Sequence, residues 1–248
     1  MANFRYKRVR EKNYFFILVI LLLLLTILLL AMGVIGFRYN IFDISFSLLV
    51  LTKYGIYSAL VTVMLSLISF GYYLKSQNKL ILVFSSLFSF LISSFIVVVF
   101  CGYIVSLKSY PFMNDISTNY DEIINFKVSK HSLPIGTSKL LQMYAGFNKP
   151  YSNLDSLYIN KSNVEEVFNK SIDILESMNL NITYKNLDEG IIEATAVSFW
   201  YEFKDDLIVR IEKLISDDIK IDVRSASRVG KSDFGKNYER IKEFLSYF

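Results

Sequence analysis

The stretch Ile219–Arg240 reads IKIDVRSASRVGKSDFGKNYER and joins a predicted strand to a predicted helix. Apolar and charged side chains alternate at its start, which predicts a strand over Ile219–Ser225 with one buried face. From Asp233 onward apolar side chains recur every three or four residues, which predicts a helix to Tyr247 with Ser232 as its N-cap. The stretch also holds three Arg, three Lys, three acids, three Ser and two Gly. This density makes it the first place to look for a functional site.

The preceding strand, Leu207–Lys213, shows the same alternation, and charge predicts how the two strands pair. An antiparallel pairing with a five-residue loop places Arg210 opposite Asp222 and Glu212 opposite Lys220. Both pairs join opposite charges, whereas a register shifted by two residues would oppose like charges. The pairing with the longer loop is therefore predicted, with the apolar face of the sheet packed on helices and the other face carrying charge.

The remaining elements of this domain follow from periodicity and turn signals. Ser162 and Glu165 match a capping box ahead of a helical stripe that ends near Asn179. Residues 108–153 are predicted to form an irregular connection, because prolines interrupt a mixture of polar and aromatic residues. Residues 154–248 are predicted to form an α+β domain of two layers, an antiparallel sheet of four or five strands with two main helices. The further predicted strands are Leu154–Ile159, Asn181–Asn186 and Ile191–Tyr201.

Residues 1–107 are predicted to cross a membrane three times. The chain of 248 residues is 53% hydrophobic and 16% aromatic, which is too apolar for a soluble domain of this length. A bilayer is spanned by about 20 apolar residues, and three such runs cover residues 14–37, 54–74 and 80–107. The first run is too long for a signal peptide, the alternative explanation of a basic start before an apolar run. Lys53 is expected at the boundary of the second span and not in an ion pathway, because no acid shares the membrane with it.

The charges that flank these spans predict their orientation. Five bases precede the first span, and the loop after the second span carries Lys75 and Lys79. Basic loops tend to stay in the cytoplasm, so the N-terminus and this loop are predicted to be cytoplasmic. Three crossings then put residues 108–248 on the far side, in the periplasm or outside the cell.

The residue inventory excludes several kinds of chemistry. One histidine, His131, and one cysteine, Cys101 inside the third span, are too few for a usual zinc site or a Cys–His nucleophile pair. Residues 107–248 carry eighteen Lys or Arg against twenty-one acids, so the net charge of +4 comes from the membrane flanks and nucleic-acid binding is not expected. No phosphate-binding or dinucleotide-binding loop motif is present. No metal or cofactor is therefore expected, and packing must stabilise a domain without cysteines.

Two segments resemble the DUF1499 family, a group of bacterial and chloroplast-associated domains of unknown function. They are IIEATAVSFWYEFKDDLIVRI, from Ile191, and IDVRSASRVGKSDFGKNYERI, from Ile221. The shorter segments DIST, from Asp115, and YSNL, from Tyr151, are weaker landmarks, and an acid and two prolines of the family pattern are missing after DIST. The resemblance covers most of residues 112–248. The residues that carry it are Glu193, Ala194, Phe203, Asp205, Asp206, Arg210, Asp222, Arg224, Ser225, Ser227, Arg228, Gly230, Ser232, Asp233, Gly235, Asn237 and Arg240.

This resemblance implies a domain preceded by membrane helices, an arrangement familiar in the family. The resemblance and the three predicted spans together lead us to expect a bacterial inner (plasma) membrane protein. Its expected partners are the lipid bilayer and an envelope lipid or protein. The resemblance implies no activity, because none is established for the family. We expect a non-enzymatic binding or structural module of the cell envelope.

Three interpretations of the charged cluster remain open. In the first, the three arginines of the stretch neutralise Asp222, Asp233 and the turn acids, and order the loops. In the second, the helix N-terminus and the arginines bind an anion, such as a lipid headgroup or an envelope precursor. In the third, Asp205 and Asp206 support hydrolysis or hold a metal, although adjacent strand residues point to opposite sides. The candidate anion-binding residues are Arg224, Ser225, Ser227, Arg228, Gly230, Ser232 and Arg240. The predicted structural charge cluster consists of Asp205, Asp206, Arg210, Asp222, Asp233 and Asn237, and no catalytic residue is assigned.

Overall fold

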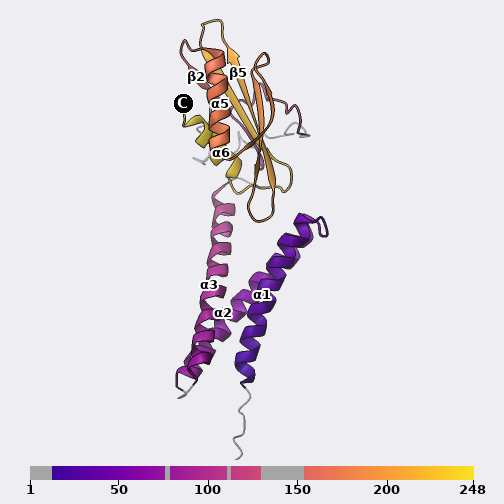
Figure 1. The fold of residues 1–248 in the computed structure, drawn as a ribbon, viewed down its shortest axis with the longest axis vertical. Coiled ribbons are helices and arrows are strands. Elements are labelled where there is room, and N and C mark those ends of the chain that lie inside the picture. Colours follow the sequence, from indigo (N-terminus) through magenta and orange to yellow (C-terminus); the bar gives the residue numbers. More distant parts are fainter. Residues whose placement is uncertain (1–12, 76–78, 111–112, 130–153) are drawn as a thin grey trace, which may run out of the picture. The chain divides into compact units, whose positions relative to one another are not determined.

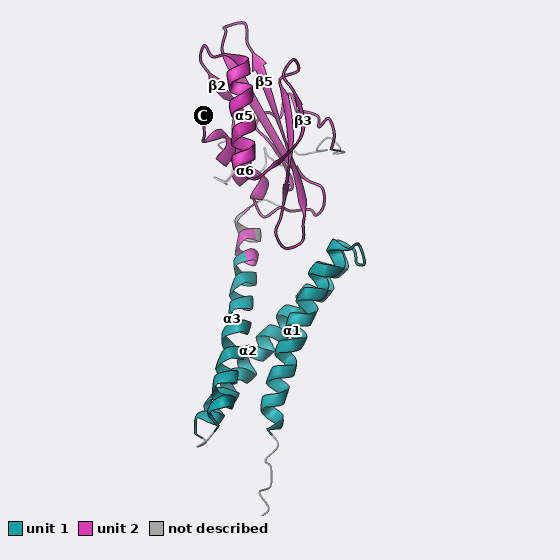
Figure 2. Ribbon diagram, viewed as in Figure 1, with its two compact units in different colours: residues 1–102 teal, residues 103–248 magenta. Residues whose placement is uncertain are grey.

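The computed structural model describes residues 13–75, 79–110, 113–129 and 154–248. It divides into a helical unit, residues 1–102, and a sheet unit, residues 103–248 (Figure 2). The basic leader, His131 and the first three residues of YSNL lie outside the described residues, as does the second half of the predicted connection.

Three apolar helices form the helical unit, as predicted (Figure 1). They are α1 (Tyr14–Arg38), α2 (Lys53–Leu74) and α3 (Leu80–Ser109), whose last residues belong to the sheet unit. The helical segments long and apolar enough to cross a membrane are Tyr14–Arg38, Phe46–Leu74 and Leu80–Ser106. The three predicted spans are therefore present as helices.

The helix that contains the second predicted span begins before that span. A π-helical segment, η1 (Phe46–Thr52), runs directly into α2, so helical structure extends beyond the predicted spanning part, residues 54–74. The hydroxyl of Thr52 donates to the carbonyl oxygen of Ser47 at 2.9 Å, five residues back, which matches the wider π-helical turn. Lys53 is exposed at this junction, with its ammonium nitrogen 5.8 Å from the centre of the Tyr57 ring.

Small polar side chains join the helices of this unit. Thr26 of α1 donates to the hydroxyl of Ser58 in α2 at 2.9 Å, and the hydroxyls of Ser69 in α2 and Ser86 in α3 lie 2.8 Å apart. Gly55 lets the backbone of α2 approach α1, since an added Cβ would lie 2.9 Å from a methyl carbon of Leu30. Small residues and hydroxyl pairs are the usual contacts of helices that pack within a bilayer.

The sheet unit is an α+β domain, as predicted (Figure 1). Its antiparallel sheet has the order β1-β6-β5-β4-β3, and β2 pairs with β6 along the same edge as β1. The strands are β1 (Asp115–Ser117), β2 (Leu157–Ile159), β3 (Asn181–Asn186), β4 (Ile191–Val197), β5 (Lys204–Lys213) and β6 (Ile219–Ser227). The helices are α5 (Val164–Ser177) and α6 (Lys236–Leu245).

The predicted register of β5 against β6 is confirmed. Arg210 lies opposite Asp222 and Glu212 lies opposite Lys220, the two complementary pairs that favoured the longer loop. This register places the alternate apolar residues of both strands on one face, where they form the main core with α5 and α6. The apolar residues predicted for this face, all buried, are Leu207, Val209, Ile211, Ile219, Ile221 and Val223.

The opposite face of the sheet carries charge, as predicted, but it is also covered. Residues 118–129 cross it after β1, and Ile124 and Phe126 pack there against Ile191 and Ile208. Sequence periodicity did not indicate this second layer, because the covering segment has no regular repeat. The charged groups between it and the sheet are therefore largely shielded from water.

Several element boundaries differ from the prediction. β1 lies inside the connection that we expected to be irregular, and β4 ends at Val197, four residues early, where the chain turns. The N-cap of α5 is Asn163, whose side chain accepts from the backbone N–H of Glu165, so the capping box at Ser162 was wrong by one residue.

The predicted start of α6 was also wrong. The helix begins at Lys236 and not at Asp233, because Gly235 has a φ of +84°, a left-handed conformation that interrupts helical geometry. The carboxylate of Asp233 performs the capping that was assigned to Ser232, and accepts from the backbone N–H groups of Gly235 at 2.9 Å and Asn237 at 2.7 Å.

Candidate functional site

The predicted site residues divide between the two faces of the sheet. Successive residues of a strand point to opposite sides, so Arg224 lies among the charges of the covered face while Ser225 lies under α6. The candidate anion-binding residues therefore do not converge on one point. Arg224 and Arg228 belong to a charged-face cluster, whereas Arg240 belongs to an α6 cluster around Asn237.

Arg224 is the centre of the charged-face cluster and its side chain is fully buried. Two of its nitrogens donate to the carboxylate of Asp115 at 2.9 and 2.8 Å, and a third donates to the carbonyl oxygen of Ile124 at 2.7 Å. Its guanidinium also lies 4.9 Å from the centre of the Phe126 ring. A guanidinium binds a carboxylate with two parallel hydrogen bonds, so this residue fastens both β1 and the covering segment to β6.

Arg228 makes the second two-point pair of this cluster. Its Nε and Nη2 donate to the buried carboxylate of Asp206 at 2.7 and 2.8 Å, and the hydroxyl of Thr195 donates to the same carboxylate at 2.6 Å. The hydrogen bond to Asp206 raises the pKa of the Arg228 guanidinium above its ordinary value. Unlike Arg224, Arg228 keeps 41% of its side chain exposed.

Asp222 forms the third pairing on this face. Its buried carboxylate accepts from Arg210 and from the hydroxyl of Ser156, and the ammonium of Lys220 lies 3.3 Å away. Burial alone would raise the pKa of Asp222, but the hydrogen bonds from Ser156 and Arg210 outweigh it and hold the pKa below its ordinary value. The carboxylate therefore stays ionised in the folded protein at neutral pH.

Glu193 is a buried acid whose partners are backbone groups. Its side chain has no exposed surface, and it accepts from the backbone N–H groups of Lys127 at 2.7 Å, Val128 at 3.2 Å and Ser129 at 2.8 Å. These three hydrogen bonds give the backbone donors of the covering segment a partner at the surface of the sheet. Glu193 therefore holds the far end of the covering segment, as Arg224 holds its middle.

The α6 cluster is centred on Asn237, which is fully buried. Its amide nitrogen donates to the hydroxyl of Ser227 at 3.1 Å, and its amide oxygen accepts from Ser225 at 2.7 Å and from Arg240 at 2.6 Å. Arg240 also donates to the carboxylate of Asp205 at 2.9 Å. These bonds fix the first turns of α6 against the end of β6.

The helix N-terminus that we proposed for an anion is already occupied by the chain. Asp233 lies there, 8% exposed, and its two backbone hydrogen bonds engage N–H groups that an anion would need. Burial raises the pKa of Asp233, and those hydrogen bonds offset part of this effect. Gly230 accepts from the side chain of Asn114 at 2.7 Å, and Ser232 accepts from the backbone N–H of Phe234 at 3.3 Å. Both residues shape the loop between β6 and α6.

Two acids, Asp222 and Asp233, have partners other than the arginines predicted for them. We expected Asp222 and Asp233 to be neutralised by the arginines of the stretch, but Arg210 binds Asp222 and backbone groups bind Asp233. The turn acids do bind arginines of the stretch, Asp205 with Arg240 and Asp206 with Arg228. They point to opposite sides of β5, so their carboxylates do not act on one atom.

Sequence reasoning missed the role of Asp115 and Thr195. Asp115 opens the DIST segment, and a search for acids that match the buried arginine could have found it. The hydroxyl of Thr195 supports Asp206 across β4 and β5, where the two residues are register partners. That signal requires the strand pairing to be known first.

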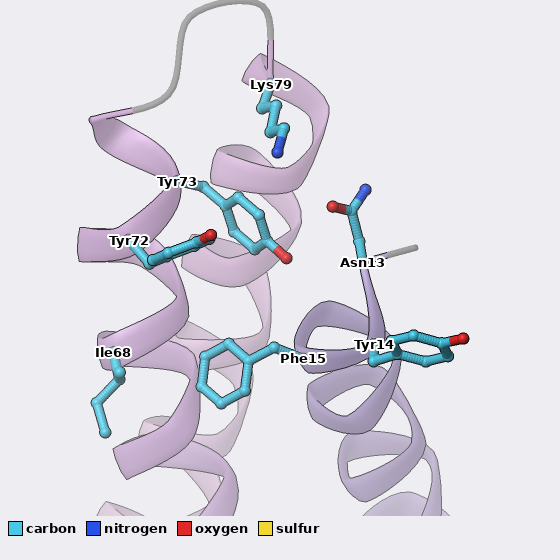
Figure 3. Close-up of a pocket in the computed structure, with 7 residues that line it drawn as sticks. All are labelled: Asn13, Tyr14, Phe15, Ile68, Tyr72, Tyr73 and Lys79. Carbon is cyan, nitrogen blue, oxygen red and sulfur yellow. The ribbon is translucent and has the colours of Figure 1, made fainter. Parts of the chain in front are cut away.

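A separate pocket of about 490 Å³ opens in the helical unit (Figure 3). Tyr73 is almost fully buried in its wall, and the ammonium nitrogen of Lys79 lies 5.7 Å from the Tyr73 ring centre. An aromatic rim with a lysine is typical of residues at a membrane interface. The residues that line the pocket are Asn13, Tyr14, Phe15, Ile68, Tyr72, Tyr73 and Lys79.

Among the described residues, no group of three or more His, Cys, Asp or Glu side chains is arranged to hold a metal ion.

Comparison with known families agrees with the two signature segments. No curated protein matches the chain. Residues 115–248 match the model of a family described as protein of unknown function (DUF1499), which spans β1 to the last residue after α6. Because this match covers more than half of the chain, the protein belongs to the DUF1499 family.

Proposed function

We propose that this protein is a bacterial inner-membrane protein that displays its DUF1499 domain outside the cytoplasm, as a non-enzymatic binding or structural module of the cell envelope. Among the described residues, three helices are long and apolar enough to cross a membrane. The bases before α1 and the two lysines between α2 and α3 favour the cytoplasm for both segments. An odd number of crossings then supports an extracytoplasmic domain.

The observation that carries the structural role is the division of Asp205 and Asp206 between the two faces of β5. Arg240 holds Asp205 under α6, and Arg228 holds Asp206 on the charged face. A pair of carboxylates that shares acid and base roles must reach one substrate from the same side. The arrangement instead supports a role in which each acid fastens one segment to the sheet.

A second candidate function is anion binding at Arg228. Its side chain is 41% exposed, whereas that of Arg240 is 14% exposed and that of Arg224 is buried. An exposed guanidinium binds phosphate with two hydrogen bonds, and a lipid headgroup or an envelope precursor would supply such a group. The anion would have to share this arginine with Asp206.

One variant separates these two functions. We would purify the full chain in detergent and compare Arg228→Ala with the wild type, both for melting temperature and for binding of a soluble short-chain phosphatidylglycerol. A lower melting temperature, with no lipid binding by the wild type, supports the structural role. An unchanged melting temperature with loss of wild-type binding supports the anion site. Lys213→Ala, at an exposed pair with Asp217, is the matched control.

A further inference from the structure

We propose that the hairpin tip between β4 and β5, residues 198–203, docks on the surface of the lipid bilayer and inserts aromatic side chains there. The tip reads SFWYEF and exposes 80% of Phe199 and 63% of Trp200. Val197, the last residue of β4, is 46% exposed. Adjacent large apolar side chains at a surface mark interaction sites, and Trp is enriched where proteins meet the headgroup region of a membrane.

The aromatic tip is held in one conformation by its own contacts. The backbone N–H of Ser198 donates to the carbonyl oxygen of Phe203, and the Ser198 hydroxyl accepts from the backbone N–H of Phe203, both at 2.9 Å. Phe199 and Trp200 meet edge to face with ring centres 5.3 Å apart, and Tyr201 stacks on Phe203 at 5.1 Å. A surface that is already ordered loses little conformational entropy on binding.

The strand register places this tip at the end of the sheet where the chain arrives from α3. Asp115 pairs with Ala226, Ala226 with Asp206, and Asp206 with Thr195, so these four residues form one row across β1, β6, β5 and β4. β4 and β5 continue past this row into the tip. β1 runs away from the same end, so Met113 and Asn114, which directly precede Asp115, lie at the end of the sheet that carries the tip.

The chain itself keeps this end of the sheet within reach of the bilayer. Residues 110–114 alone separate the end of α3 from β1, and the six steps from Ser109 to Asp115 span at most about 22 Å when fully extended. Within the sheet unit, the hydroxyl of Tyr110 donates to the carboxylate of Glu239 in α6 at 3.1 Å. The short chain between the end of α3 and β1 sets this limit, so the limit holds on whichever side of the membrane the domain lies.

Exposed lysines flank the aromatic tip. Lys204 directly follows it, and the backbone N–H of Arg228 donates to the carbonyl oxygen of Lys204 at 3.0 Å, which brings the loop with exposed Lys231 alongside. Basic side chains near a membrane surface are attracted to anionic headgroups. Aromatic residues beside lysines therefore suit a bilayer better than a hydrophobic groove of another protein.

Trp200 is the only tryptophan of the chain, so its fluorescence reports on the tip alone. We would reconstitute the full chain in vesicles of phosphatidylethanolamine and phosphatidylglycerol. Quenching of Trp200 by iodide in the water would be compared with quenching by lipids that carry a nitroxide label near the top of the acyl chain. The proposal predicts blue-shifted emission, strong quenching by the labelled lipid and weak quenching by iodide.

Two variants make the test specific. Phe199→Ser removes an apolar group from the tip and keeps the reporter, and is expected to abolish most of the lipid quenching and restore quenching by iodide. Ile215→Ser is the matched control, because Ile215 is fully exposed in the turn between β5 and β6 at the other end of the sheet, and should leave both unchanged. Iodide-accessible Trp200 in the wild type would overturn the proposal. Shielding from both quenchers would also overturn it, since that outcome indicates contact with a second copy of the chain.

Discussion

Arg224 and Asp115 lie 109 positions apart in the sequence and form a two-point ion pair in which the arginine side chain is fully buried. The pair joins β6 to β1, its partner at the sheet edge. The same guanidinium donates to the carbonyl oxygen of Ile124, so one side chain holds two segments that precede the rest of the sheet in the chain. Arg224, one of the family signature residues, therefore stabilises the fold by holding these segments on β6.

Removing one member of this pair should destabilise the domain strongly. Asp115→Asn leaves the Arg224 charge buried beside a neutral amide, and breaking a buried ion pair typically costs about 3–5 kcal/mol. A denaturant titration of the full chain in detergent would measure the loss. The double variant Asp115→Leu with Arg224→Met should lose less stability than Asp115→Asn, since it leaves no buried charge. A double variant that is less stable than the single one would contradict this explanation.

Glu193 should control how firmly residues 127–129 cover the charged face. In Glu193→Gln, an amide group replaces one acceptor oxygen and faces backbone N–H donors, and leaving a buried donor without a partner costs about 1–3 kcal/mol. Hydrogen exchange measured by mass spectrometry should become faster over residues 124–129 and stay unchanged in α5. Equal protection of residues 124–129 in the variant and the wild type would refute the fastening role of this carboxylate.

The stability of the domain should fall in acid because of Asp222. Its pKa is lowered in the folded state, so the unfolded chain takes up a proton first as the pH falls below the ordinary value of 3.8. Stability from this group is thus present above that pH and is lost as the pH falls toward the lower folded pKa. Melting temperatures between pH 6 and pH 2, measured on the full chain, should fall less steeply for Asp222→Asn than for the wild type.

Asp233 changes the stability of the domain in acid in the opposite direction to Asp222, and a third residue provides the control for this titration. Burial raises the pKa of Asp233, so its protonation in acid favours the folded state and partly offsets the loss at Asp222. Asp233→Asn should therefore steepen the acid loss. Asp217→Asn, at a turn residue whose side chain is 74% exposed, should leave the profile unchanged. If the melting temperature fell equally steeply with pH in Asp222→Asn and the wild type, the loss of stability in acid could not be assigned to Asp222.

Two glycines of the loop before α6 should differ in their tolerance of alanine. Gly230 and Gly235 have φ of +89° and +84°, and a left-handed conformation costs a residue with a Cβ about 1–2 kcal/mol. A Cβ on Gly230 meets nothing closer than 3.7 Å, whereas one on Gly235 would lie 2.5 Å from the ring of Tyr110. Gly235→Ala should therefore lower the melting temperature more than Gly230→Ala. Equal losses would show that the Tyr110 ring moves aside.

The sheet could be predicted from sequence where its determinants are local. The alternation in β5 and β6 and the two complementary charge pairs fixed both the faces and the register, which the structure confirms. The start of α6 could not be predicted in the same way. Ser232 and Asp233 are both good capping residues, and the choice depends on the left-handed turn at Gly235 and on the ring of Tyr110 beside it.

The charged face illustrates why the site was only partly predictable. One of the three interpretations expected the arginines of the stretch to neutralise the turn acids, and Arg228 does bind Asp206, but the sequence did not indicate which arginine binds which acid. The cover over this face depends on Glu193 binding backbone N–H groups. Every residue except proline carries that donor, so no side-chain pattern marks residues 127–129 as the partners of this acid.

We propose that the DUF1499 domain lies across the membrane from the N-terminus, and a pair of reporter fusions tests this topology. One fusion joins a phosphatase that is active only outside the cytoplasm after residue 248, and a second joins it after residue 77, between α2 and α3. A fluorescent protein that matures only in the cytoplasm replaces the phosphatase at both positions as the reciprocal reporter. We predict phosphatase activity at residue 248 and fluorescence at residue 77. Fluorescence at residue 248, without phosphatase activity there, would contradict the proposed topology.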